Sequence, residues 1–138
     1  MGRIVALDYG NKRVGMAVTD PLQIIATPLE TIHSKDVLSY LKAYFLKEEV
    51  EALVVGLPQT LAGTPTDVTS AVVGLVRKLK KEFPNLPVHT VDERFTSRMA
   101  RQAMLAGGVK KMDRRDKATV DRISATIILQ SFLESRSR

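Results

Sequence analysis

The first part of the chain has the apolar pattern of a three-stranded meander. Residues 3–7 are mostly apolar and are typical of a buried strand. A turn at residues 8–12 leads to residues 13–19, whose partial alternation predicts the returning strand of a hairpin. Residues 24–32 predict a third strand. Pro28 interrupts that run, and it favours an edge position because proline donates no hydrogen bond to a neighbouring strand.

The rest of the chain alternates between helical and strand patterns. Ser34 is expected to cap a helix, because apolar residues follow it at helical spacing. Residues 52–56 form a short apolar run, typical of a strand buried on both faces. Thr64 and Pro65 predict the start of the next helix, and residues 88–91 predict the last strand.

Two helices are expected after that strand. Thr96 or Ser97 would cap a short helix that ends at the glycine pair 107–108, and Asp116 would cap the final one. The order predicts one α/β domain covering residues 1–138. Its mixed five-stranded sheet would carry helices on both faces.

Charge is distributed unevenly along the chain. The net charge of the protein is +6, but residues 94–138 hold eleven basic and four acidic residues, a net of +7. This asymmetry favours a nucleic acid or another polyanion as partner, although a solvated surface would look similar. Lys78, Lys80 and Lys81 are interpreted as such a solvated helix face.

Composition excludes several classes of protein. The chain has no cysteine, which excludes disulfides and thiolate metal sites. No apolar run approaches the roughly 20 residues that span a bilayer. The first residues predict a strand rather than an apolar leader, so the cytoplasm is the expected compartment, with no membrane partner.

Three acidic residues lie at predicted element boundaries. Asp8 follows the first strand, Glu93 follows the last strand, and Asp121 is near the start of the final helix. Ligands of open α/β sheets bind beyond the carboxyl ends of the strands, where these residues could meet. Clustered carboxylates hold hard divalent cations such as Mg²⁺, and two such cations about 4 Å apart support phosphoryl transfer.

Each acidic residue also has a simpler interpretation. Asp8 could be a turn residue, Glu93 an exposed acid paired with an arginine, and Asp121 a helix-surface partner of Lys117. Asp92 competes with Glu93 for the metal, because adjacent residues of a strand point to opposite faces. The basic candidates for phosphate binding have the same ambiguity, since each could be an ion-pair partner: Arg13, Arg94, Arg98, Arg101, Lys110 and Lys111.

Four motifs in order give the chain a resemblance to a known family. They are Leu7-Asp8-Tyr9-Gly10 with Arg13 and Gly15, Val55-Gly56-Leu57-Pro58 with Gly63, Val91-Asp92-Glu93-Arg94-Phe95-Thr96-Ser97, and Val120-Asp121 with Ile128-Leu129-Gln130. Over residues 3–134 the sequence resembles the YqgF family, also called RuvX. The family often has a more polar loop than the chain has at residues 59–63.

The resemblance implies a ribonuclease H-like fold, with strand order 3-2-1-4-5, and a nuclease. Asp8, Glu93 and Asp121 would be the catalytic carboxylates that bind Mg²⁺ or Mn²⁺. The implied activity is maturation of the 5′ end of precursor 16S ribosomal RNA, and resolution of Holliday junctions is the alternative. Association with the ribosome would follow from the former, for a monomer or weak homodimer.

Two other functions compete with a nuclease. An ATPase of the actin-like or sugar-kinase type also begins with Asp-x-Gly after a strand, but it needs a second domain for which 138 residues leave no room. A non-catalytic module could bind nucleic acid through the basic C-terminal third, with structural acids. Hydrolysis of a labelled substrate separates a nuclease from such a module.

Overall fold

A computed structural model describes residues 2–10, 12–57, 67–92 and 117–136. The elements, in chain order, are β1 (Arg3–Tyr9), β2 (Arg13–Thr19), β3 (Ala26–His33), the 3₁₀ turn η1 (Ser34–Asp36), α1 (Val37–Lys47), β4 (Val50–Leu57), α2 (Asp67–Glu82), β5 (Val88–Asp92) and α5 (Lys117–Arg136). In the described residues, no helix is long and apolar enough to cross a membrane.

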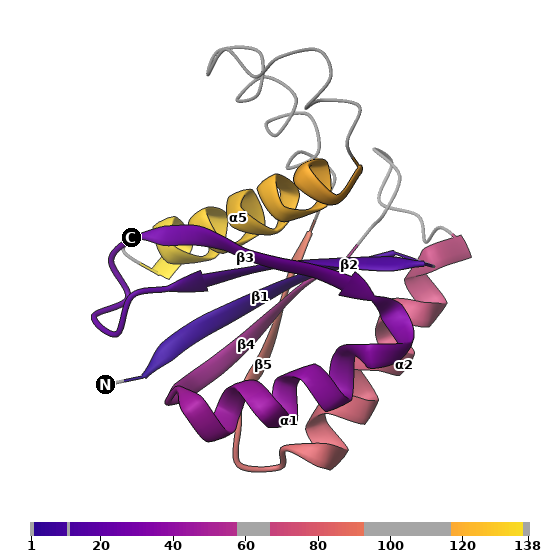
Figure 1. Ribbon diagram of the computed structural model, residues 1–138, viewed down its shortest axis with the longest axis horizontal. Helices are drawn as coiled ribbons and strands as arrows, with labels where there is room; N and C mark the ends of the chain where they lie inside the picture. Colours follow the sequence, from indigo (N-terminus) through magenta and orange to yellow (C-terminus); the bar gives the residue numbers. More distant parts are fainter. Residues whose placement is uncertain (1, 11, 58–66, 93–116, 137–138) are drawn as a thin grey trace.

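The strands form one mixed sheet in the order β3-β2-β1-β4-β5. The first three strands are antiparallel neighbours, whereas β1, β4 and β5 run parallel. The predicted strand order and the mixture of parallel and antiparallel pairing are therefore confirmed. Because β1, β4 and β5 point the same way, their carboxyl ends lie at the same end of the sheet (Figure 1).

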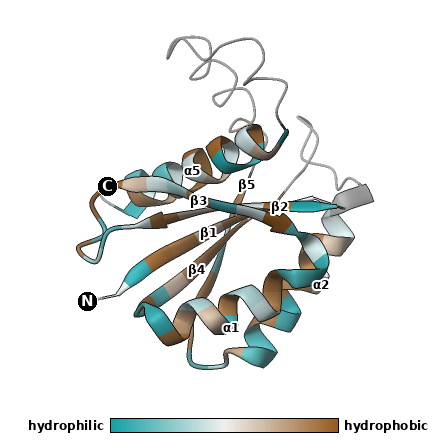
Figure 2. Ribbon diagram, viewed as in Figure 1, coloured by the Kyte–Doolittle hydropathy of each residue, from teal (hydrophilic) through white to brown (hydrophobic). Residues whose placement is uncertain are grey.

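Helices cover both faces of the sheet. α5 packs on one face, and α1 and α2 pack on the other (Figure 1). Alternation along β1 sends Ile4 and Ala6 to the α5 face and sends Val5 and Leu7 to the α1–α2 face. All four side chains are buried, and the strands form the hydrophobic centre of the molecule between helices with polar outer positions (Figure 2).

The central strand β4 is buried on both faces, as its apolar run predicts. Leu53, Val54 and Val55 have no exposed surface. Among the described strands β3 is at an edge of the sheet, where Pro28 costs little because only one side of an edge strand pairs with a neighbour.

Two local predictions are wrong. The third strand begins at Ala26 rather than at residue 24, because the Asp20 carboxylate accepts hydrogen bonds from the backbone N–H groups of Ile24 and Ile25 and holds them in a turn. Ser34 does not cap a helix directly. It begins the 3₁₀ turn η1, which His33 caps by accepting from the Lys35 N–H at 3.1 Å.

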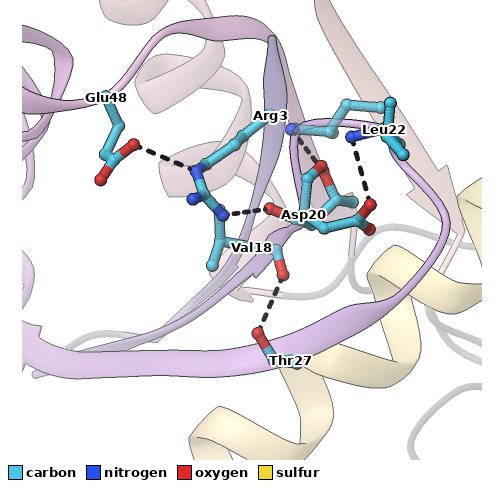
Figure 3. Close-up of polar contacts among 8 residues, drawn as sticks. Arg3, Val18, Asp20, Leu22, Thr27 and Glu48 are labelled. Carbon is cyan, nitrogen blue, oxygen red and sulfur yellow. Dashed lines mark hydrogen bonds and ion pairs between the residues drawn. The ribbon is translucent and has the colours of Figure 1, made fainter. Parts of the chain in front are cut away.

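Polar contacts fasten the end of the sheet where β1 begins. The Arg3 guanidinium contacts a Glu48 carboxylate oxygen at 3.2 Å and donates to the Thr19 carbonyl at 3.0 Å (Figure 3). Asp20 accepts from the Leu22 N–H nearby. These contacts are structural, and they are at the end of β1 opposite to Asp8.

Candidate nucleic-acid active site

Asp8 lies near the carboxyl end of β1 and on the face that α5 covers. Its place follows from alternation, since Ile4 and Ala6 on the same strand face α5. In the β1–β2 ladder Asp8 is directly opposite Gly15. Opposite residues in an antiparallel pair share a face, so the position beside Asp8 carries no side chain.

Gly15 allows α5 to approach the sheet at Asp121. A methyl group at Gly15 would be 2.0 Å from the Asp121 carbonyl oxygen and 2.8 Å from its Cβ, which are distances that no side chain tolerates. The missing side chain therefore lets the helix backbone rest on β2. This contact brings Asp121 next to Asp8, although the two residues come from opposite ends of the chain.

Two further contacts fix the beginning of α5. The Arg13 Nε donates to the Asp121 Oδ2 at 2.8 Å, and this ion pair is partly exposed. The Thr31 hydroxyl of β3 donates to the Ala118 carbonyl at 2.8 Å. The expectation that Asp121 pairs along its own helix with Lys117 is thus replaced by a pair with β2. The ion-pair alternative for Arg13 is the one that the structure contains.

Asp8 and Asp121 line the same open pocket, of about 370 Å³. We call this the carboxylate pocket; its other lining residues are Tyr9, Gly10, Lys12, Arg13 and Lys117. It combines two carboxylates with three cationic side chains. Carboxylate oxygens are suited to a hard divalent cation, and the surrounding cations are suited to phosphate groups.

Sequence reasoning did not identify Lys12 and Lys117 as residues of this pocket. A signal for each was present. Lys12 lies in the turn that follows Asp8, and Lys117 precedes Asp121 by four positions, which places both on one face of a helix.

The structure separates Asp92 from Asp8. Val91 packs in the core beneath α5, so alternation places its neighbour Asp92 on the α1–α2 face. Asp92 pairs in register with Leu57, which packs on that same face. Asp92, the last residue of β5, is therefore on the opposite face of the sheet from Asp8.

The remaining predicted site residues lie outside the described residues. They are Glu93, Arg94, Arg98, Arg101, Lys110 and Lys111. Within residues 2–10, 12–57, 67–92 and 117–136, no group of three acidic, histidine or cysteine side chains could hold a metal. The described part of the chain thus supplies a pair of carboxylates at the pocket.

The histidines have no catalytic arrangement in the described structure. His33 caps η1 with its Nδ1 atom. His89 packs against Phe132 of α5 with ring centroids 5.0 Å apart.

Comparison with solved structures supports the fold. The chain is similar to the structure titled "T. thermophilus RuvC in complex with Holliday junction substrate", with a TM-score of 0.58 and 14% identity, over 99% of this chain and 96% of that one. A second Thermus thermophilus RuvC structure gives a TM-score of 0.56 at 13% identity, over 98% and 96% of the two chains. The sheet and its flanking helices are ribonuclease H-like, as predicted.

Sequence comparison identifies the family. A relative from Amoebophilus asiaticus is 50% identical over 138 residues, which is 100% of this chain and 98% of the relative. One from Bacteroides thetaiotaomicron is 51% identical over 136 residues, 99% of each. Both bear the name "Putative pre-16S rRNA nuclease". The family model described as "RuvX: Holliday junction resolvase" matches residues 2–135, and the chain belongs to the RuvX family.

Proposed function

We propose that this chain is a metal-dependent endonuclease of structured nucleic acid that processes the 5′ end of precursor 16S ribosomal RNA. The observation that carries the proposal is the meeting of Asp8 and Asp121 in one pocket beside three cationic side chains. Membership of the RuvX family and the names of the relatives support a nuclease. The support for precursor 16S ribosomal RNA as the substrate comes from the names of the relatives.

The donor set fits a divalent cation such as Mg²⁺ or Mn²⁺. Asp8 and Asp121 provide carboxylate oxygens at the carboxyl end of β1, and we propose Glu93, the residue after β5, as a third ligand. Glu93 has the same sequence parity as Val91, which faces α5. When bound, the metal would supply activation of the attacking water and stabilisation of the leaving oxygen.

The chain's own residues position the carboxylates and the substrate. Arg13 holds Asp121 through the 2.8 Å bond to Oδ2, and Gly15 keeps that aspartate close to β2. Lys12 and Lys117 are at the rim of the same pocket, where they can neutralise the phosphates on either side of the scissile bond. The proposed phosphate contacts outside the described residues are Arg94, Arg98, Arg101, Lys110 and Lys111.

Substitution of the acids tests the proposed roles. Asp8→Asn keeps the shape of the side chain and removes its charge, so cleavage should be lost while nucleic-acid binding remains. Folding stability should hold or rise, because carboxylates that share a pocket repel each other. Glu93→Gln should lose cleavage as well. Asp92→Asn is the matched control, and it should cleave at the wild-type rate because Asp92 is on the other face of the sheet.

A direct assay decides between the substrates. End-labelled precursor 16S RNA and a four-way DNA junction are incubated with the protein over a range of Mg²⁺ and Mn²⁺ concentrations. Preferential cleavage of the RNA at its 5′ end supports the proposal. Preferential, symmetric cleavage of the junction would favour a Holliday junction resolvase, the activity in the family's description. Tight binding without cleavage of either substrate would favour a non-catalytic module.

A further inference from the structure

A second hollow adjoins the carboxylate pocket, on the α1–α2 side of the sheet. Its volume is about 500 Å³, within the range of roughly 300–1,000 Å³ typical of ligand clefts. We call it the lysine groove. Its polar lining comes from Tyr9, Ser34, Lys35 and Lys78, and its apolar lining includes Leu38 and Leu75.

The groove and the carboxylate pocket share one lining residue, Tyr9. This residue lines both hollows, since it follows Asp8 at the end of β1. Asp8 faces α5, and Tyr9 packs against the core beneath α1 and α2. A ligand bound at Asp8 can therefore extend past the Tyr9 ring into the lysine groove without leaving the protein surface.

The charges of the groove suit a polyanion. Lys35 and Lys78 come from different elements, η1 and α2, and both line the hollow. Both are exposed, and no acidic residue is among the groove's described lining. The sequence groups Lys78 with Lys80 and Lys81 on one solvated face. The structure separates them, because Lys80 and Lys81 do not line the groove.

The apolar lining indicates which form of nucleic acid fits. Leu38 and Leu75 line the hollow together with Tyr9. A duplex keeps its bases stacked inside and presents backbone to a protein, whereas a single strand exposes base faces that pack on aromatic and apolar side chains. A groove with two lysines and an apolar lining therefore matches an unpaired strand better than a duplex.

We propose that the lysine groove binds a single-stranded segment of nucleic acid that runs on from the scissile phosphate in the carboxylate pocket. The inference rests on the proposed nuclease function, because that function places the scissile phosphate in the carboxylate pocket. Lys35 and Lys78 contact backbone phosphates, and the Tyr9 ring packs against a base. The groove would then select substrates with an unpaired extension next to the cleavage site.

The first test compares two double variants that remove the same charge. Binding is measured by fluorescence anisotropy without divalent metal, on an RNA hairpin with a single-stranded extension and on the same hairpin without it. Lys35→Ala with Lys78→Ala should weaken binding of the extended hairpin about tenfold and flatten its log–log salt slope by ~1.4, at about 0.7 per phosphate contact. Lys80→Ala with Lys81→Ala, exposed residues of α2 outside the groove, should change neither.

The second test blocks the groove without changing its charge. A Cβ atom at Gly74 of α2 would have no neighbour within 4 Å, and Gly74 lines the groove. Gly74→Leu should therefore fill the hollow while the helix remains intact, since leucine favours helices more than glycine does. Binding of the extended hairpin should weaken, with its salt slope unchanged. Binding of the hairpin without an extension should stay at the wild-type level.

Several results would overturn the proposal that the lysine groove binds a single strand. They are equal losses in the two double variants, equal losses on both hairpins, or wild-type binding by Gly74→Leu with native circular dichroism. Failure of the nuclease proposal looks different. In that case the wild-type protein cleaves no substrate at any metal concentration, while the binding differences between variants and hairpins persist.

Discussion

Gly15→Ala tests whether the close contact between β2 and α5 builds the proposed active site. The new methyl group would be 2.0 Å from the Asp121 carbonyl oxygen and 2.3 Å from its carbonyl carbon. These are backbone atoms, which cannot rotate away as the end of a flexible side chain can. Since real Cβ atoms are at least 3.0 Å from such neighbours, α5 has to retreat by about 1 Å or more.

The retreat should affect stability and activity to different degrees. Overpacking of this kind costs about 1–3 kcal/mol, which for a domain of this size lowers the melting temperature by about 4–12 °C. A displacement of about 1 Å at a catalytic group costs on the order of 100-fold in rate. Gly15→Ala should therefore remain folded at 25 °C and cleave about 100-fold more slowly than the wild type.

Gly2→Ala is the matched control. Its methyl group would be 2.9 Å from the Glu51 backbone nitrogen, so it also crowds a backbone, but at the end of β1 opposite to Asp8. It should lose stability and keep its cleavage rate. Melting is followed by circular dichroism, and cleavage is assayed under single-turnover conditions at saturating Mn²⁺. Wild-type cleavage by a folded Gly15→Ala protein, or an equal rate loss in Gly2→Ala, would refute the argument.

Two further predictions concern charge. The hydrogen bond from the Ile25 N–H, with others from the same turn, holds the pKa of Asp20 below its ordinary value of 3.8, so the ionised carboxylate stabilises the folded state. Asp20→Asn should be less stable than the wild type above pH about 4, and the two urea unfolding curves should converge as the pH falls below that value; a constant difference would contradict the role of the charge. Separately, changing Arg98, Arg101, Lys110 and Lys111 together to alanine should flatten the salt slope of nucleic-acid binding by about two units if the four side chains make half of their four possible phosphate contacts, at about 0.7–0.9 per contact. An unchanged slope would mean that the basic C-terminal third is not the binding surface.

The sequence alone determined the local elements and their order. The apolar run at residues 3–7 and the partial alternation of residues 13–19 predicted the hairpin, and the apolar run at residues 52–56 predicted a strand buried on both faces. These patterns are readable because a strand's side chains alternate between faces and a helix repeats every 3.6 residues, whatever the rest of the chain does. The parallel pairing followed from connection rules for helices between strands.

Local chemistry was harder to read where a side chain bonds to a backbone nearby. Ile24 and Ile25 look like strand residues by composition, yet the Asp20 carboxylate draws their N–H groups into a turn. His33, rather than Ser34, caps η1, because the His33 Nδ1 atom accepts a hydrogen bond from the Lys35 N–H. The strand propensity of isoleucine is an average over many proteins, and a single carboxylate acceptor close to the backbone can override it.

Only the tertiary structure decided how the site is built. The sequence offered Asp8 and Asp121 as candidates, but the glycine that lets α5 approach β2 makes them neighbours. Packing also assigned Asp92 to the other face and placed Lys35 and Lys78 in the lining of one groove. The spacing of residues along the sequence determines which side chains share a face of one helix or strand. Which residues of two different elements become neighbours depends on packing, and here on a side chain small enough for two backbones to touch. The pocket that Asp8 and Asp121 share depends on Gly15, a residue without a side chain.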